Sequence, residues 1–187
     1  MSAATATKAK AEAIPAGSYR LDPVHSTVGF EVKHMISTFR GSFRDYDASL
    51  VSEDSGVRLE GSAGAASVDV RDENLSVHLQ SPEFFDAERH PQITFSSERV
   101  GVAGDGSVEL DGELTIKGIT RPIRATGRLD QVEADMAGGR RIGLELETTA
   151  DRREFGLNWN APLPKGGFVL GNDVKLVVRL ELVPEEK

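Results

Sequence analysis

The sequence contains no cysteine. This absence excludes a disulfide framework, a zinc–thiolate site, an iron–sulfur cluster and a cysteine nucleophile. Basic residues are also few, since 22 Lys and Arg stand against 30 Asp and Glu and give a net charge of −8. Binding to a nucleic-acid backbone needs a basic surface, so the charge balance argues against a nucleic-acid partner.

Long apolar runs are lacking as well. No stretch approaches the roughly twenty apolar residues that span a bilayer, so we predict no transmembrane segment. Residues 1–17 are rich in alanine and contain no uninterrupted apolar core of the kind that a secretory signal needs. We therefore predict a disordered leader over residues 1–17 and a cytoplasmic protein, or a periplasmic or secreted one if the chain is a processed form.

The length and composition are those of one ordinary domain. The whole chain has 187 residues, of which 39% are hydrophobic and 28% are charged. No internal repeat, low-complexity tract or linker divides it after the leader. We predict a single domain over residues 18–187.

Apolar and polar side chains alternate through most of this domain. In the segment 26–34, Val28, Phe30 and Val32 occupy every second position, and the segments 108–117, 142–147 and 174–182 alternate in the same way. Such a pattern places apolar side chains on one face of a strand and is typical of antiparallel sheets. A change of phase within 38–50 predicts a bend near Arg44. Closing about eight such strands into a barrel removes open edges, and its interior would be elongated, apolar and suited to a chain-like lipid.

One helical interruption is expected over residues 71–90. Leu75 and Leu79 are spaced for one helix face. The pair Ser81–Pro82 predicts an N-cap followed by proline at the first position of a short second helical turn, which would carry Phe84 and Phe85. Adjacent side chains do not easily face one interior.

Several motifs resemble the YceI-like family, in order and at the family's spacings from Ser18 to Val183. They are YRLDPVHS at 19–26, VGFEVKH at 28–34, ISTFRGSF at 36–43, RDENL at 71–75, SPEFFD at 81–86, HPQITF at 90–95, GELTIKGITRP at 112–122 and RREFGLNW at 152–159.

The resemblance implies an all-β, extended, eight-stranded antiparallel lipocalin-like barrel with the helical excursion near residues 71–90. It also implies binding of a long-chain amphiphilic lipid, namely a polyisoprenoid, an isoprenoid quinone or a fatty amide, by a homodimer with no catalytic activity. No cofactor other than this bound lipid is expected. Many relatives begin with a signal peptide. Because we predict none in residues 1–17, the family's usual periplasmic location is not carried over.

The aromatic residues by themselves are more typical of packed core than of a ligand wall. The resemblance reverses that preference, so we predict that the inward-facing apolar residues contact lipid, with Phe84 and Phe85 as a lid. The predicted lipid-binding residues are Val28, Phe30, Val32, Phe39, Phe43, Phe84, Phe85, Ile93, Phe95, Leu110, Leu114, Ile116, Leu144, Phe155 and Trp159. The predicted polar mouth of the cavity consists of His25, Ser26, His34 and Asp72.

Metal binding and hydrolysis are the competing interpretations of the polar motifs. His25 and His34 lie on opposite faces of an unbroken strand, so we predict no metal site. The pair His25–Ser26, with Asp22 nearby, contains the residue types of a catalytic triad. Neighbouring side chains on a strand point apart, however, and no G-x-S-x-G elbow occurs. Arg152 and Asp72 fit a structural ion pair better than catalysis.

Two other functions stay open at this point. An enzyme acting on such a lipid would need polar groups that converge inside the barrel. A dimeric stress or scaffold protein would have a filled barrel without a continuous void.

Overall fold

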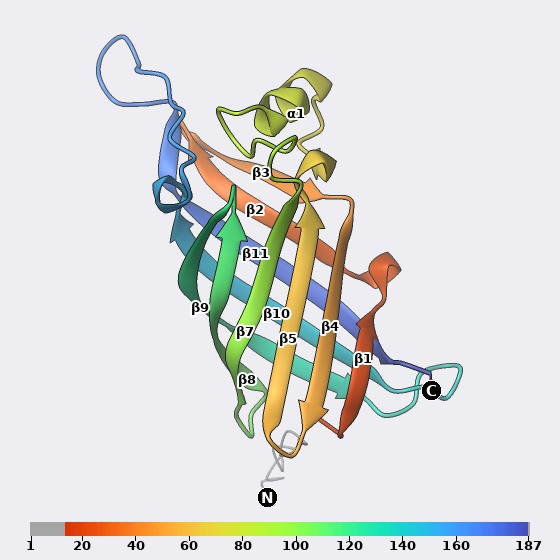
Figure 1. Cartoon of the computed structure of the whole chain (residues 1–187). Helices are drawn as coiled ribbons and strands as arrows, with labels where there is room; N and C mark the ends of the chain where they lie inside the picture. The colour runs from red at the N-terminus through yellow and green to blue at the C-terminus, as the bar shows by residue number, and fades with distance from the viewer. Residues whose placement is uncertain (1–13, 187) are drawn as a thin grey trace, which may run out of the picture.

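The chain folds into a closed antiparallel β-barrel (Figure 1). The computed structural model describes residues 14–186. Its strands form one sheet in the order β1-β4-β5-β7-β8-β9-β10-β11-β2-β3-β6, and pairing between β1 and β11 closes the ring. The ring itself consists of the eight strands from β1 to β11 in this order, so the predicted all-β, eight-stranded barrel is confirmed.

Strands are joined by short turns, with one helix at the end of the barrel that lies uppermost in Figure 1. The strands are β1 (Gly17–Leu21), β2 (Thr27–His34), β3 (Ser37–Phe43), β4 (Tyr46–Glu53), β5 (Gly56–Gly64), β6 (Val68–Asp69), β7 (Gln92–Val102), β8 (Ser107–Ile116), β9 (Ile119–Val132), β10 (Arg141–Asp151) and β11 (Leu170–Pro184). The helices are α1 (Glu73–Gln80) and the 3₁₀ turns η1 (Pro23–His25), η2 (Ala65–Ser67) and η3 (Arg152–Phe155).

Bent strands let a sheet of this size close on itself. The long strand β11 pairs with β2 along its first part and with β1 at its end, so β1, η1 and β2 follow it as one interrupted strand. Strand β3 ends at Phe43 and β4 begins at Tyr46, which is where the change of hydrophobic phase predicted a bend. A break of this kind adds curvature and redirects the following side chains.

The core is divided along the barrel axis into two clusters. The first, which we call the closed end, lies toward the N-terminus of the described chain, at the bottom of Figure 1. Its most deeply buried members include Leu50, Val108, Ile142 and Leu182. The second cluster lies beneath α1 and contains Leu79, Phe84, Phe85, Leu114 and Phe155. One end of the barrel is therefore filled by side chains, whereas the other is covered by a helical segment.

The covering segment, residues 71–90, is called the lid segment here. Asp72 caps α1, because its Oδ1 accepts a hydrogen bond from the backbone N–H of Leu75 at 2.8 Å. The short turn predicted after Ser81–Pro82 is present and carries Phe84 and Phe85, but it is a hydrogen-bonded turn rather than a helical one. Ser81 is the C-cap of α1 and not an N-cap. The proline favours this outcome because it ends the regular hydrogen bonding of α1.

The predicted leader lies mostly outside the described residues, which begin at Ile14. Within the part that is described, the Ile14 side chain is buried in the closed end and β1 starts at Gly17. No helix in residues 14–186 is both long enough and apolar enough to cross a membrane.

Candidate ligand cavity

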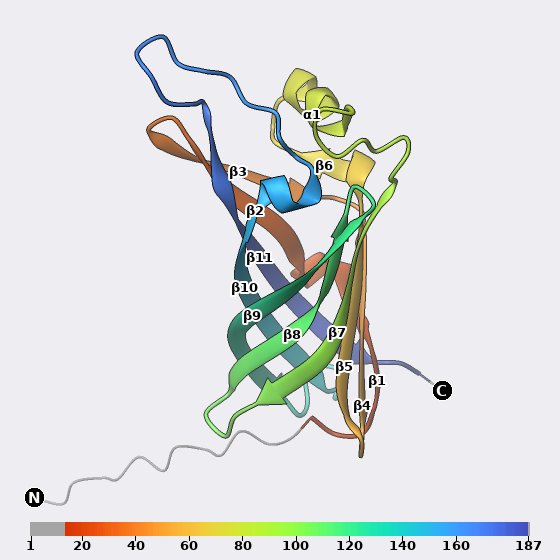
Figure 2. The ribbon, with the colours of Figure 1, turned by 60° about the vertical axis from the view of Figure 1, so that its left-hand side comes forward.

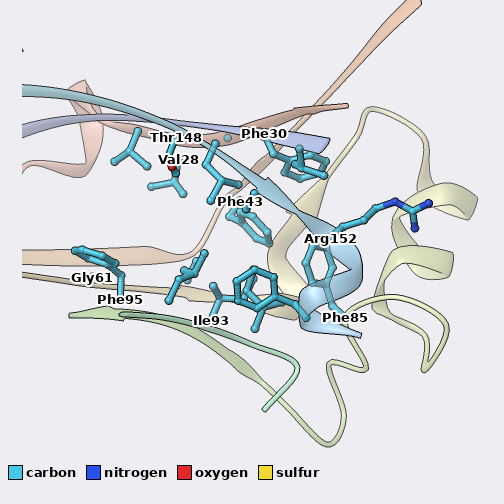
Figure 3. A pocket seen from close by; sticks show the side chains of 18 of the residues that line it. Val28, Phe30, Phe43, Gly61, Phe85, Ile93, Phe95, Thr148 and Arg152 are labelled. Carbon is cyan, nitrogen blue, oxygen red and sulfur yellow. The ribbon is translucent and has the colours of Figure 1, made fainter. Parts of the chain in front are cut away.

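A cavity of about 520 Å³ lies between the two core clusters and extends to the lid segment, whose residues form part of its lining. Its volume falls within the range of sites that hold small-molecule ligands, roughly 300–1,000 Å³. Figure 3 shows the side chains along its length, from Gly61 and Phe95 at one end to Phe85 and Arg152 at the other. Phe43 and Ile93 lie between these ends.

The wall of the cavity is apolar because the strands alternate. Inward positions on β2, β7, β8 and β11 carry Val, Leu, Ile and Phe, while their sequence neighbours face outward. Beyond the predicted residues, the wall contains Leu59, Leu75, Leu79, Ala125, Leu146, Leu157, Leu170, Val174, Leu176 and Leu180. Such a surface binds apolar groups by removing them from water.

The structure places all but one of the predicted lipid-binding residues on this wall. They are Val28, Phe30, Val32, Phe39, Phe43, Phe84, Phe85, Ile93, Phe95, Leu110, Leu114, Ile116, Phe155 and Trp159. Their contact with a lipid stays a prediction, since position on the wall is a property of the fold alone.

Leu144 is the exception, and its assignment to the wall was wrong. It faces inward as the alternation requires, but it packs in the closed end with only 1% of its surface exposed. Its neighbours across the sheet are Leu129 on β9 and Leu180 on β11. Two positions further along the same strand, Leu146 does reach the cavity. The boundary between filled and hollow barrel therefore runs across β10 between these two leucines.

The predicted polar mouth is only partly assembled. His34 lines the cavity near its open end, at the last position of β2. Asp72 is outside the lining, because its carboxylate caps α1. His25 and Ser26 lie at η1, between β1 and β2, and are also outside the lining. The prediction was therefore wrong for three of these residues, which have local structural roles instead.

Ser26 serves to fasten η1 to the barrel. Its hydroxyl donates to the backbone oxygen of Asp22 at 2.7 Å and accepts from the backbone N–H of Glu181 at 2.9 Å. His25 contacts the Asp22 carboxylate through Nδ1 at 3.0 Å. The Ser26 hydroxyl is thus bound to backbone groups and is buried, an arrangement that stabilises a turn and leaves no exposed nucleophile.

Both phenylalanines of the lid segment face the cavity, contrary to the expectation for adjacent side chains. Phe84 and Phe85 are buried and line it together. The backbone turns sharply here, since the N–H groups of Phe84 and Asp86 both donate to the oxygen of Ser81, and Asp86 has a positive φ of 49°. A strand or regular helix would have separated the two rings, whereas a tight turn brings both inward.

His78 is a cavity residue that the sequence did not single out. It lies on α1, and its ring makes edge contacts with Phe84 and Trp159 at centroid distances of 5.0 and 5.2 Å. Its Nε2 lies 2.6 Å from a carboxylate oxygen of Glu83. The helical spacing was a usable signal, because His78 follows Leu75 by three positions and shares its face. The ring contact between His78 and Trp159 links the lid segment to the chain after η3.

Arg152 is buried at the start of η3, and its guanidinium contacts no acidic side chain within residues 14–186. The structural ion pair that the sequence allowed between Arg152 and Asp72 is not formed, because the Asp72 carboxylate caps α1. Arg152 instead donates to the backbone oxygens of Leu157, Trp159 and Gly171 at 2.7, 2.7 and 2.9 Å. Burial lowers the pKa of this guanidinium from its usual value. Figure 3 shows its charged group pointing away from the cavity, so it holds the lid-side loops in place rather than presenting a charge to a ligand.

A second polar cluster lies outside the cavity, around Arg141. Its guanidinium contacts Asp22, Asp135 and Glu181 at 2.8, 2.7 and 2.5 Å. Asp22, His25 and Glu181 are close enough together to suggest metal ligands. Arg141 already supplies a positive charge to both carboxylates of that group, which lowers the need for a cation. The absence of a metal site stays a prediction.

This cluster should make stability sensitive to acid. Hydrogen bonds lower the pKa of Asp22 to about 2, chiefly from His25 and then Arg141, and lower that of Asp135 to about 2, chiefly from Arg141. Both folded-state values lie below the ordinary value of 3.8. Their contribution is therefore complete above about pH 4 and is lost as the pH falls toward about 2. We expect Arg141→Met to lower stability at neutral pH and to reduce the loss between these pH values.

Urea denaturation of wild type and variant at several pH values measures this difference. Arg58→Met is a suitable control, because Arg58 is exposed and reaches only Glu53, at 3.9 Å. Equal losses in wild type and Arg141→Met on acidification would contradict the role assigned to the cluster.

These features together define the class of the protein, a lipocalin-like antiparallel barrel with an apolar internal cavity beneath a short lid. Comparison with known proteins then gives the family. The model of the YceI-like domain matches residues 19–182, so the chain belongs to the YceI-like family.

Relatives cover most of the chain. A UPF0312 protein of Staphylococcus aureus strain USA300 is 30% identical over 169 residues, which is 88% of this chain and 96% of the relative. The crystal structure of Burkholderia cenocepacia BcnA has a TM-score of 0.74 at 22% identity and covers 86% of this chain and 98% of its own. A polyisoprenoid-binding domain from Saccharophagus degradans, implicated in plant cell wall breakdown, has a TM-score of 0.68 at 13% identity over 89% and 98% of the two chains. At these identities the two structures show a shared fold.

Proposed function

We propose that this protein binds and carries a long-chain amphiphilic lipid, such as a polyisoprenoid, an isoprenoid quinone or a fatty amide, without transforming it. The observation that carries this proposal is the apolar cavity that runs from the closed end to the lid segment. The Saccharophagus degradans neighbour, described as a polyisoprenoid-binding domain, supports a ligand of this class. Burial of each CH₂ group would contribute about 0.8 kcal/mol.

The distribution of polar groups suggests how such a lipid would lie. The deep part of the cavity is bounded by Leu59, Leu110 and Leu180, which offer no hydrogen bonds. His34 and His78 lie toward the lid segment. A chain with one polar end is best accommodated with its tail toward the closed end and its head near the two histidines, because an unpaired polar head is costly to bury in the apolar part.

Three polar residues of the wall have local partners, which favours binding over catalysis. Thr148 donates to the backbone oxygen of Arg124 at 2.7 Å, and Arg152 is held by backbone oxygens. His78 contacts Glu83, an exposed residue of the lid segment. An enzyme acting on the lipid would need a nucleophile and a base aimed at one point in the cavity. A filled scaffold barrel is disfavoured by the cavity itself.

The oligomeric state and the compartment belong to the proposal as well. We propose a homodimer, which light scattering on the purified protein measures directly. We also propose a cytoplasmic location, which fractionation of cells tests.

Lipid binding is tested by titration. Protein purified from cells should carry a lipid that native mass spectrometry detects, and solvent extraction should identify its class. After delipidation, we expect saturable binding of a long isoprenoid alcohol such as geranylgeraniol, with weaker binding of its C10 analogue because fewer CH₂ groups are buried. A delipidated sample that binds no isoprenoid, quinone or fatty amide would contradict the proposal.

A further inference from the structure

Two tips at the lid end of the barrel expose large apolar side chains to solvent. The β2–β3 turn carries Met35 and Ile36, and the loop before β11 carries Phe168. Ile36 is 95% exposed and Phe168 is 63% exposed. We call residues 35–36 and 161–169 the docking tips. Figure 2 shows both projecting beyond the barrel on the side of α1, with the β2–β3 turn in orange and the loop in blue.

The chemistry of the β2–β3 turn is unusual for a tight hairpin. His34 pairs with Ser37, so only Met35 and Ile36 form the turn. Two-residue turns strongly prefer Asn, Asp or Gly, because they need a positive φ and face water. Here Met35 adopts a φ of 48° and Ile36 is fully solvent-facing. The positive φ is unfavourable for Met35 and the full exposure is unfavourable for Ile36, which points to a role for their apolar side chains.

The docking tips are joined to each other and to the cavity. The backbone N–H of Met35 donates to the oxygen of Val169 at 2.9 Å, which fixes the β2–β3 turn beside the end of the loop. His34, Val169 and Leu170, which adjoin the exposed residues in sequence, line the cavity. A surface that contacted the docking tips would therefore lie next to the end of the cavity that the lid segment covers.

The charged residues on the docking tips and directly beside the β2–β3 turn are opposite in sign to the net charge of the chain. The segments 33–40 and 161–169 contain Lys33, Arg40 and Lys165 and no acidic residue, whereas the chain carries a net charge of −8. Arg40 is paired with Glu31 on β2. Lys33 and Lys165 have no ion pair within residues 14–186, and Lys33 reaches only the backbone oxygen of Ile36. The docking tips thus combine apolar side chains with the unpaired charge of Lys165, and the unpaired charge of Lys33 lies two residues before the β2–β3 turn.

We propose that the docking tips insert into the surface of an anionic lipid bilayer and bring the lid end of the cavity to the membrane. This proposal rests on the proposed lipid-binding function, because it supplies the route by which a membrane-resident ligand enters. Apolar side chains that enter the headgroup region beside basic residues are the usual determinants of such contacts. A protein–protein interface commonly uses about 20–30 residues on each side, which two narrow tips do not offer.

Co-sedimentation with vesicles tests the contact. The probes are vesicles of phosphatidylcholine alone and of phosphatidylcholine with about 30% phosphatidylglycerol. We expect wild type to bind the anionic vesicles and to be released by salt. The double variant Ile36→Asp/Phe168→Asp should bind them at least tenfold more weakly. The matched control is Val132→Asp/Met136→Asp, which adds the same charge at exposed apolar positions beside the β9–β10 turn, outside the docking tips.

A second, milder variant keeps the experiment interpretable if the Asp substitutions disturb folding. Lys33→Gln/Lys165→Gln keeps both apolar side chains and should lose the preference for anionic over neutral vesicles. Unchanged vesicle binding by both docking-tip variants, or no binding by wild type, would overturn the proposal. Conversion of a dimer to a monomer by Ile36→Asp/Phe168→Asp would also overturn it, because the tips would then contact a second copy of the chain.

The same samples separate this proposal from the lipid-binding function. Isoprenoid delivered from solution should bind the Ile36→Asp/Phe168→Asp variant as it binds wild type, since neither residue lines the cavity. Transfer of the isoprenoid from vesicles to this variant should be slower than its transfer from vesicles to wild type. Failure of wild type to bind isoprenoid from solution contradicts the proposed function, whereas vesicle binding is measured independently of the ligand.

Discussion

Replacing Leu114 with tryptophan is expected to weaken lipid binding by about tenfold or more while leaving the ligand-free protein nearly as stable. Leu114 lies on β8 and lines the cavity, so the indole ring can occupy space that a ligand would otherwise fill. Excluding about two CH₂ groups from the cavity would cost ~1.6 kcal/mol of binding, which is more than tenfold in affinity. Lipid titration and urea denaturation of the delipidated protein measure the two effects.

The matched control is Leu144→Trp, which makes the same substitution in the closed end. Leu144 is outside the lining of the cavity and packs among the buried side chains of the closed end. Overpacking such a site typically costs about 1–3 kcal/mol of folding free energy. We therefore expect Leu144→Trp to lower folding stability, whereas Leu114→Trp should mainly weaken lipid binding. A large stability loss with unchanged lipid uptake in Leu114→Trp would place Leu114 in ordinary core and contradict the course of the cavity.

Gly127→Ala is expected to destabilise the barrel strongly, by about 3 kcal/mol, at the upper end of the usual cost of overpacking. Gly127 lies on β9 opposite Leu146 of β10. A Cβ at this position would overlap the backbone oxygen of Glu145, and backbone of a paired strand cannot move aside as a flexible side chain can. The two strands would have to separate locally, which would break their hydrogen bonds.

Gly143→Ala provides the control on the facing strand. A Cβ there would meet its nearest neighbour, the backbone oxygen of Asp130, at 3.8 Å, which is ordinary contact. We expect a change of less than about 1 kcal/mol, since alanine also restricts the unfolded chain more than glycine does. Thermal and urea unfolding of both variants test the comparison. Equal stability of the two would show that β9 and β10 approach each other less closely at Gly127.

The alternation of apolar residues was sufficient to predict the barrel and most of its inner wall. Period-two patterns determine which face of a strand is buried, and Val28, Phe30 and Val32 of β2 and Leu110, Leu114 and Ile116 of β8 were identified for that reason. The bend between β3 and β4 was also predictable, because the phase of the pattern changes near Arg44. These properties depend on residues that are close in sequence.

Position along the barrel axis was not predictable in the same way. Leu144 and Leu146 have the same residue type and the same facing, yet only Leu146 lines the cavity. Their difference depends on the stagger between β9, β10 and β11, which alternation does not specify. The polar mouth was misassigned for a similar reason, since His25 and His34 are near in sequence but η1 and the end of β2 are separated along the barrel.

The uneven filling of the barrel has a consequence for its motions. Ile142 and Leu144 belong to the closed end, whereas Thr148 and Ala150, on the same strand, border the cavity. Amide hydrogens near the first pair should exchange with solvent only through global unfolding, whether or not ligand is present. Those near the second pair have an unfilled space behind them, so local opening should be easier until a bound chain occupies it. Strand β10 would thus report ligand occupancy along half of its length and overall stability along the other half.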